Sequence, residues 1–141
     1  MPDCIYLHYT VPGDDFTRAG EASADLKLRL KKLGIPPEAV RKVSIALYEG
    51  EINLAIHAHG GEIDVQITDD AVCMTLSDQG PGIADIPLAM SEGYSTAPDE
   101  VRSLGFGAGM GLPNMKKYSD EFDIQSTVGV GTTIKMAVHV D

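Results

Sequence analysis

Hydrophobic and polar residues follow two different patterns along the chain, and the change from one to the other marks out the expected elements. Short apolar or alternating runs are typical of strands, whereas apolar residues recurring every three or four positions indicate helices. Strand-type sequence covers residues 4–11, 62–67, 71–76, 121–126 and 132–140. Helix-type sequence covers residues 15–32, 35–61 and 112–119.

Turn-forming residues divide these runs. Gly34 ends the first helix, prolines open the second, and two glycines close it. Residues 68–70, Thr-Asp-Asp, form a turn signal that predicts a hairpin between two strands. The resulting order, β-α-α-β-β-loop-α-β-β, predicts a two-layer α/β sandwich with one layer of helices on a mixed sheet. We expect one domain, residues 1–141.

Composition narrows the classes of partner. The chain has 141 residues and is 43% hydrophobic, which is enough for one core. Eleven basic against 21 acidic side chains give a formal net charge of −10, which argues against nucleic acid and anionic membranes as partners. The start, MPDCIYLHYT, lacks the features of a signal peptide, and no apolar run is long enough to span a membrane. These features predict a cytoplasmic protein.

The two cysteines, Cys4 and Cys73, are far apart in apolar, strand-type sequence. We expect them to be small buried residues, not a disulfide or a metal site.

The long predicted helix carries a polar stripe. Glu49, Asn53 and His57 are spaced four residues apart, which places them on one face among apolar neighbours. An asparagine oxygen is a suitable ligand for Mg²⁺, and a glutamate one turn earlier would reach a hydroxyl or water near that ion. A solvated helix face of ordinary composition would show the same spacing.

Glycines form a second candidate site. The stretch GFGAGMG places Gly105, Gly107, Gly109 and Gly111 directly before a predicted helix. Backbone without side chains lets a phosphate approach, and amides at a helix start favour it. The spacing matches neither a P-loop nor a dinucleotide-binding fingerprint. A flexible turn remains the alternative.

The stretch DQGPGI follows a predicted strand. An ionised Asp78 would accept a hydrogen bond from the amino group of a purine, while Gly80 and Gly82 would let the base lie against backbone. A turn-forming aspartate is the simpler alternative for Asp78.

Taken in order, four stretches resemble the motifs of the GHKL superfamily of ATP-binding domains, over about residues 5–140. They are YEGEINLAIHAHGG, DQGPGI, GFGAGMGLPNMKK and GVGTTI. The resemblance implies the Bergerat ATP-binding fold and the cofactors ATP and Mg²⁺. It also implies that Glu49 is the general base, Asn53 the Mg²⁺ ligand and Asp78 the adenine-binding residue, with Thr132 assisting at the adenine side.

The resemblance implies a wider set of nucleotide contacts and a mobile lid at about residues 84–105. Gly107, Gly109 and Gly111 would line the triphosphate. The full set of expected nucleotide-binding residues is Asn53, His57, Asp78, Gly80, Gly82, Ile83, Gly105, Gly107, Gly109, Met110, Gly111, Leu112 and Thr132.

Within this superfamily the chain is most similar to the small anti-sigma-factor and switch serine kinases of bacteria, through GYSTA, GAGMGLPNMKK, SDEFDIQS and GVGTT. This similarity implies a serine/threonine protein kinase that phosphorylates a small STAS-domain partner, with a sigma factor as a further possible partner and a homodimer as a possible assembly. The alternative is a non-catalytic, ATP-gated anti-sigma or scaffold protein.

Two residues depart from the pattern of these relatives. Gly50 and Glu51 stand where small apolar residues are usual, and a glycine inside a helix costs about 1 kcal/mol relative to alanine. Glu51 is a rival for the role of base, but its offset of two residues turns it about 200° away from Asn53, which favours Glu49. The pair His57 and His59 suggests a metal site only weakly, because helix positions two apart diverge.

Overall fold

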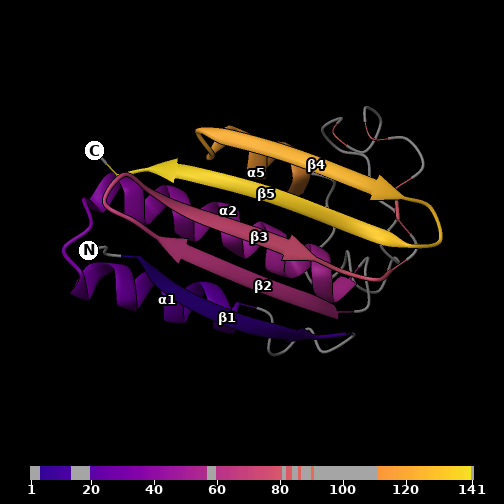
Figure 1. Ribbon diagram of the computed structural model, residues 1–141, viewed down its shortest axis with the longest axis horizontal. Helices are drawn as coiled ribbons and strands as arrows, with labels where there is room; N and C mark the ends of the chain where they lie inside the picture. Colours follow the sequence, from indigo (N-terminus) through magenta and orange to yellow (C-terminus); the bar gives the residue numbers. More distant parts are fainter. Residues whose placement is uncertain are drawn as a thin grey trace, which may run out of the picture.

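The computed structural model describes residues 4–13, 20–56, 60–80, 82–83, 86, 90 and 111–140. In this part of the chain, five strands form one sheet and three helices lie on one side of it (Figure 1). The strands are β1 (Ile5–Pro12), β2 (Gly60–Ile67), β3 (Ala71–Ser77), β4 (Glu121–Thr127) and β5 (Gly131–His139). The helices are α1 (Glu21–Lys32), α2 (Pro37–Ile56) and α5 (Gly111–Lys117). The predicted two-layer sandwich is confirmed.

The sheet order is β1-β2-β3-β5-β4, and every pair of neighbours is antiparallel. The sheet formed by the described strands is therefore antiparallel, and the prediction of a mixed sheet was wrong. Two helices connect β1 to β2, so the chain returns to the end of the sheet where β1 finished and β2 runs back along it (Figure 1). The tight turns between β2 and β3 and between β4 and β5 give antiparallel hairpins in the ordinary way.

The first helix is shorter than predicted. It begins at Glu21, after Gly20 in a left-handed conformation with φ 105°. A residue in the left-handed conformation does not continue an α-helix, so α1 starts only after Gly20. The predicted helical residues 15–19 lie outside the described residues.

The core lies between the helices and the sheet. Helix α2 packs against both α1 and α5, and the inward residues of the central strands meet its apolar face. The largest fully buried side chains are Leu26, Leu30, Val43, Leu47, Ile63, Val65, Val72, Met74, Leu76, Met115 and Val138. None of the described helices is long and apolar enough to cross a membrane.

The opposite face of the sheet is polar and bears the two cysteines. Both are free thiols and only partly buried, so the expectation of buried cysteines was wrong. The side-chain amide of Gln66 on β2 donates a hydrogen bond to Cys4 Sγ at 2.9 Å. Alternation along a strand puts every second residue on this face, whatever its polarity.

Candidate functional site

The C-terminal half of α2 approaches β3 and α5 closely, and Gly50 is the reason. A β-carbon built on Gly50 would overlap the Leu76 side chain and lie 3.3 Å from Met115 Sδ. Leu76 and Met115 are themselves buried, so neither can easily move away. The glycine inside α2 therefore allows helix–sheet and helix–helix contact that a larger residue would block.

Glu49 precedes this glycine and faces α5. Asn114, in α5, donates a hydrogen bond from Nδ2 to Glu49 Oε2 at 2.8 Å, and both side chains are partly buried. Asn53, one helical turn after Glu49, is also partly buried. The structure thus keeps Glu49 and Asn53 on one partly accessible stripe of α2, as the sequence predicts. Nothing in the sequence pattern identified Asn114 as a partner.

Glu51 is turned toward α1 and has a different role. Its side chain is only 2% exposed, and its two carboxylate oxygens accept hydrogen bonds from the backbone amides of Ala22 and Ser23, each at 3.0 Å. These are amides of the first turn of α1, which have no partners within the helix. Glu51 therefore binds the start of α1, in agreement with the predicted divergence from Asn53.

Asp78 closes the end of β3. Its Oδ1 accepts hydrogen bonds from the amides of Gly80, at 2.8 Å, and Thr132, at 3.3 Å. Its own amide donates to the Thr132 carbonyl at 3.0 Å. Asp78 thus has the turn-forming contact that the sequence left open as the simpler alternative. The same contacts hold its carboxylate in one orientation beside the start of β5.

A hydroxyl pair joins the DQGPGI stretch to the last hairpin. The Ile83 amide donates to Ser126 Oγ at 2.7 Å, and Ser126 Oγ lies 2.8 Å from Thr132 Oγ1. Gly82 has φ 79°, and a β-carbon there would lie 2.5 Å from the Thr127 carbonyl oxygen. Ser126 was not predicted as a site residue, because it lies outside every glycine motif.

The Asp78 region adjoins the end of α2 through Gly61. A β-carbon at Gly61 would lie 2.8 Å from Leu54 Cδ2 and 3.3 Å from Asp78 Cβ. The end of α2, the end of β3 and the start of β5 consequently meet at one end of the sandwich (Figure 1).

Several of the remaining predicted positions are not described by the structure. His57, Gly105, Gly107, Gly109 and Met110 lie outside the described residues, as does almost all of the expected lid. Gly111 is the first residue of α5, and Leu112 beside it is buried, with 8% exposure.

Asn53 offers a hard amide oxygen, which suits a Mg²⁺ ion that takes its other ligands from phosphates and water, and the Glu49 carboxylate lies one helical turn before it. In the described part of the chain, no group of three or more His, Cys, Asp and Glu side chains is arranged to hold a metal by itself. The Asn53 side chain suits a Mg²⁺ ion that receives most of its ligands from outside the protein.

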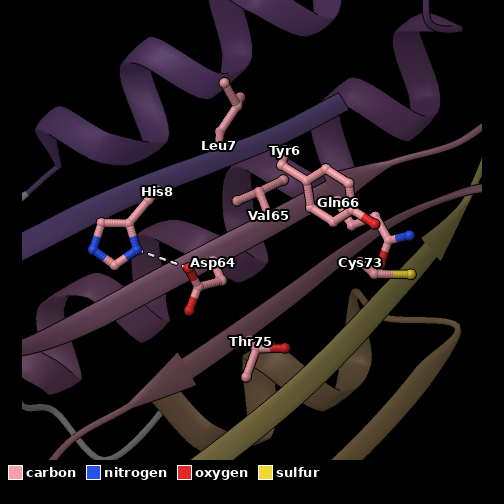
Figure 2. Close-up of a pocket in the computed structure, with 8 residues that line it drawn as sticks. All are labelled: Tyr6, Leu7, His8, Asp64, Val65, Gln66, Cys73 and Thr75. Carbon is pink, nitrogen blue, oxygen red and sulfur yellow. Dashed lines mark hydrogen bonds and ion pairs between the residues drawn. The ribbon is translucent and has the colours of Figure 1, made fainter. Parts of the chain in front are cut away.

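A shallow pocket also lies on the polar face of the sheet, away from the helices (Figure 2). None of its lining residues is a predicted site residue; they are Tyr6, Leu7, His8, Asp64, Val65, Gln66, Cys73 and Thr75. His8 is already held there between two carboxylates, at 2.7 Å from Asp64 Oδ1 and 2.6 Å from Glu62 Oε1. The sheet separates this pocket from Glu49 and Asn53.

Comparison with known proteins identifies the family of this chain. A model of the histidine kinase-like ATPase domain matches residues 15–138. The serine/threonine-protein kinase RsbT of Bacillus subtilis is 33% identical over 109 residues, 74% of this chain and 76% of RsbT. An anti-sigma F factor of Caldanaerobacter subterraneus is 31% identical over 108 residues, 73% of this chain and 72% of that protein.

Two solved structures share the fold. The RsbU and RsbW domains of a Mycobacterium tuberculosis protein give a TM-score of 0.64 at 16% identity, covering 95% of this chain and 32% of that one. The SiaB-SiaC complex of Pseudomonas aeruginosa gives a TM-score of 0.66 at 13% identity, covering 94% of this chain and 88% of the matched one. At such identities the likeness shows the fold alone.

Proposed function

Because the chain belongs to the histidine kinase-like ATPase domain family, we propose that it is a regulatory serine/threonine protein kinase that uses Mg-ATP. The proposed substrate is a Ser or Thr hydroxyl of a small STAS-like partner in the cytoplasm. The similarity to RsbT, whose name states this class of activity, supports the proposal. The observation that carries it is the Glu49 carboxylate, held by Asn114 one turn from Asn53.

The proposed chemistry depends mainly on positioning and charge. When bound, Mg-ATP supplies the phosphoryl group and the ion offsets its charge. Asn53 would hold the ion, and the Asp78 carboxylate would accept a hydrogen bond from the adenine amino group. Glu49 would take the proton of the acceptor hydroxyl. The hydroxyl oxygen would bond to the γ-phosphorus while the bond between that phosphorus and the leaving ADP breaks. Gly105, Gly107, Gly109 and Gly111 would contribute backbone amides to the phosphates.

The arrangement of the two glutamates supports Glu49 as the base. Glu51 directs both oxygens to α1 amides and is almost completely buried, so it has no route to a substrate hydroxyl. Glu49 is partly exposed, and its Oε2 binds a neutral amide group. A base must be able to reach the proton that it removes.

Glu49→Gln should abolish phosphoryl transfer and leave ATP binding within about twofold, because the amide keeps the shape but cannot take a proton. The measurement is the transfer of label from γ-labelled Mg-ATP to proteins of a host lysate, beside calorimetry of ATP binding. Glu38→Gln is the matched control, since Glu38 is an exposed residue at the start of the same helix. Unchanged transfer in Glu49→Gln would remove Glu49 from the mechanism.

A second candidate function is an ATP-gated anti-sigma or scaffold protein without transfer. The similarity to the anti-sigma F factor supports this second candidate function. A switch needs only that nucleotide bind one state of the protein better than another. ATP binding that is lost in Asp78→Asn, with no labelled protein in any lysate fraction, would favour this function over the kinase.

A further inference from the structure

Helix α5 is the element that connects the second glycine motif to α2. It begins at Gly111, the last glycine of GFGAGMG, and is fixed on the core by Leu112 and Met115, which are 8% and 0% exposed. Met115 lies against Gly50 of α2, where a β-carbon would come within 3.3 Å of its sulfur. The start of α5 is therefore held in a defined position relative to the α2 stripe.

Asn114 lies between these two buried anchors and is the residue of α5 that reaches Glu49, through the 2.8 Å hydrogen bond from Nδ2 to Oε2. An amide donates to a carboxylate without adding a charge or a titratable proton. A lysine or arginine here would stabilise the ionised carboxylate much more strongly and so weaken it as a base. The amide can orient Glu49 and leave its second oxygen to act on a substrate.

We propose that Asn114 is a positioning residue that fixes the orientation of the Glu49 carboxylate on the α2 stripe that also carries Asn53. This inference rests on the proposed kinase function. Because Asn114 is three residues beyond Gly111, the start of α5 and the amide that holds Glu49 belong to one helix.

The expected effect is on the rate of transfer rather than on nucleotide binding. Misplacing a catalytic group by about 1 Å can lower a rate by about 100-fold. Asn114→Leu keeps the size of the side chain and removes the donor. We expect its kcat to fall at least about tenfold, with KM for ATP within about twofold of the original protein.

The test is steady-state transfer with γ-labelled Mg-ATP and the acceptor protein that the lysate experiment identifies, together with calorimetry and thermal melting. Asn114→Asp has the same shape as asparagine but places a carboxylate beside Glu49, so its kcat should fall at least as far as that of the leucine variant. Gln125→Leu is the matched control. It makes a similar amide-to-leucine change at an exposed position of β4 and should behave as the original protein.

The outcomes separate this inference from the proposed function. If Glu49→Gln abolishes transfer but Asn114→Leu transfers at the original rate, the positioning role is wrong and the kinase function stands. If Asn114→Leu loses ATP affinity and melts earlier in proportion to its loss of rate, Asn114 serves packing, and the inference is overturned. If Glu49→Gln transfers normally, or no transfer occurs at all, the proposed function fails and the positioning role fails with it.

Discussion

The candidate site depends on single side chains, and two chemically identical ones have different roles because they point in different directions. Glu49 and Glu51 are two residues apart on one helix, yet one meets α5 and the other meets α1. The angle per residue of an α-helix predicts this divergence from the sequence. It does not predict the partners, because Asn114 and Ala22 come from elements distant in the chain.

The clearest single-residue electrostatic feature is His8 on the polar face of the sheet (Figure 2). Its hydrogen bond to Asp64, and then the one to Glu62, raises the pKa of His8 above its ordinary value of 6.5. A raised pKa in the folded state means that folding favours the protonated ring. The resulting stabilisation is complete below about pH 6.5 and is lost as the pH rises through the folded pKa.

His8→Gln should therefore lower the melting temperature at acidic pH and have little effect at alkaline pH. The change should be small, because the group is exposed and water screens the pair. Thermal melting of both proteins across this pH range measures it. A difference that stays constant with pH would mean that His8 acts through packing and not through its charge.

At the scale of elements, the contact between α1 and α2 depends on a buried acid. Glu51 accepts from two amides at the start of α1, where Gly20 provides no side chain to cap the helix. A carboxylate there also interacts favourably with the helix dipole. The substitution of an acid for the usual apolar residue is thus explained by the neighbouring helix.

Glu51→Gln should lower the free energy of unfolding by about 1–3 kcal/mol, because the NH₂ group of glutamine cannot accept a hydrogen bond from one of the two amides. Glu38→Gln, at an exposed residue of the same helix, should stay within about 0.5 kcal/mol. Urea denaturation of the three proteins gives the comparison. Equal stability of Glu51→Gln and Glu38→Gln would show that these two hydrogen bonds contribute nothing net.

Gly50 shows why element-level predictions from sequence are incomplete. Helix propensity identifies it only as an unfavourable residue at about 1 kcal/mol. In the structure, the missing side chain is what brings α2 against Leu76 and Met115. The unfavourable helix propensity of Gly50 is accompanied by close packing of α2, β3 and α5. That packing cannot be seen from the sequence of α2 alone.

For the whole molecule, we expect the net charge of −10 to affect the stability of the folded state more than the exposed ion pairs of the described residues do. Exposed pairs such as Arg29–Asp25 and Arg41–Glu38 contribute little to stability, because water and salt screen them. Repulsion among an excess of acidic groups acts over the entire surface of the compact chain.

Raising the ionic strength from about 0.01 M to about 0.15 M shortens the screening length from about 30 Å to about 8 Å. We expect the melting temperature of the nucleotide-free protein to rise over this range at neutral pH, because repulsion is weakened more than the exposed pairs are. The effect should shrink as the pH approaches the isoelectric point near 4.6. A melting temperature that falls with salt would show that the ion pairs dominate.

The order of elements, the two-layer sandwich, the family and the stripe of Glu49 and Asn53 can all be inferred from the sequence alone. These depend on local periodicity, on turn residues and on motifs that lie close together in the chain. The folded arrangement was needed to show that the sheet is antiparallel, that Asn114 holds Glu49, that Glu51 binds α1 and that Ser126 joins Ile83 to Thr132. The contacts of Glu49, Glu51 and Ile83 join residues distant in the chain, so they depend on how the layers pack.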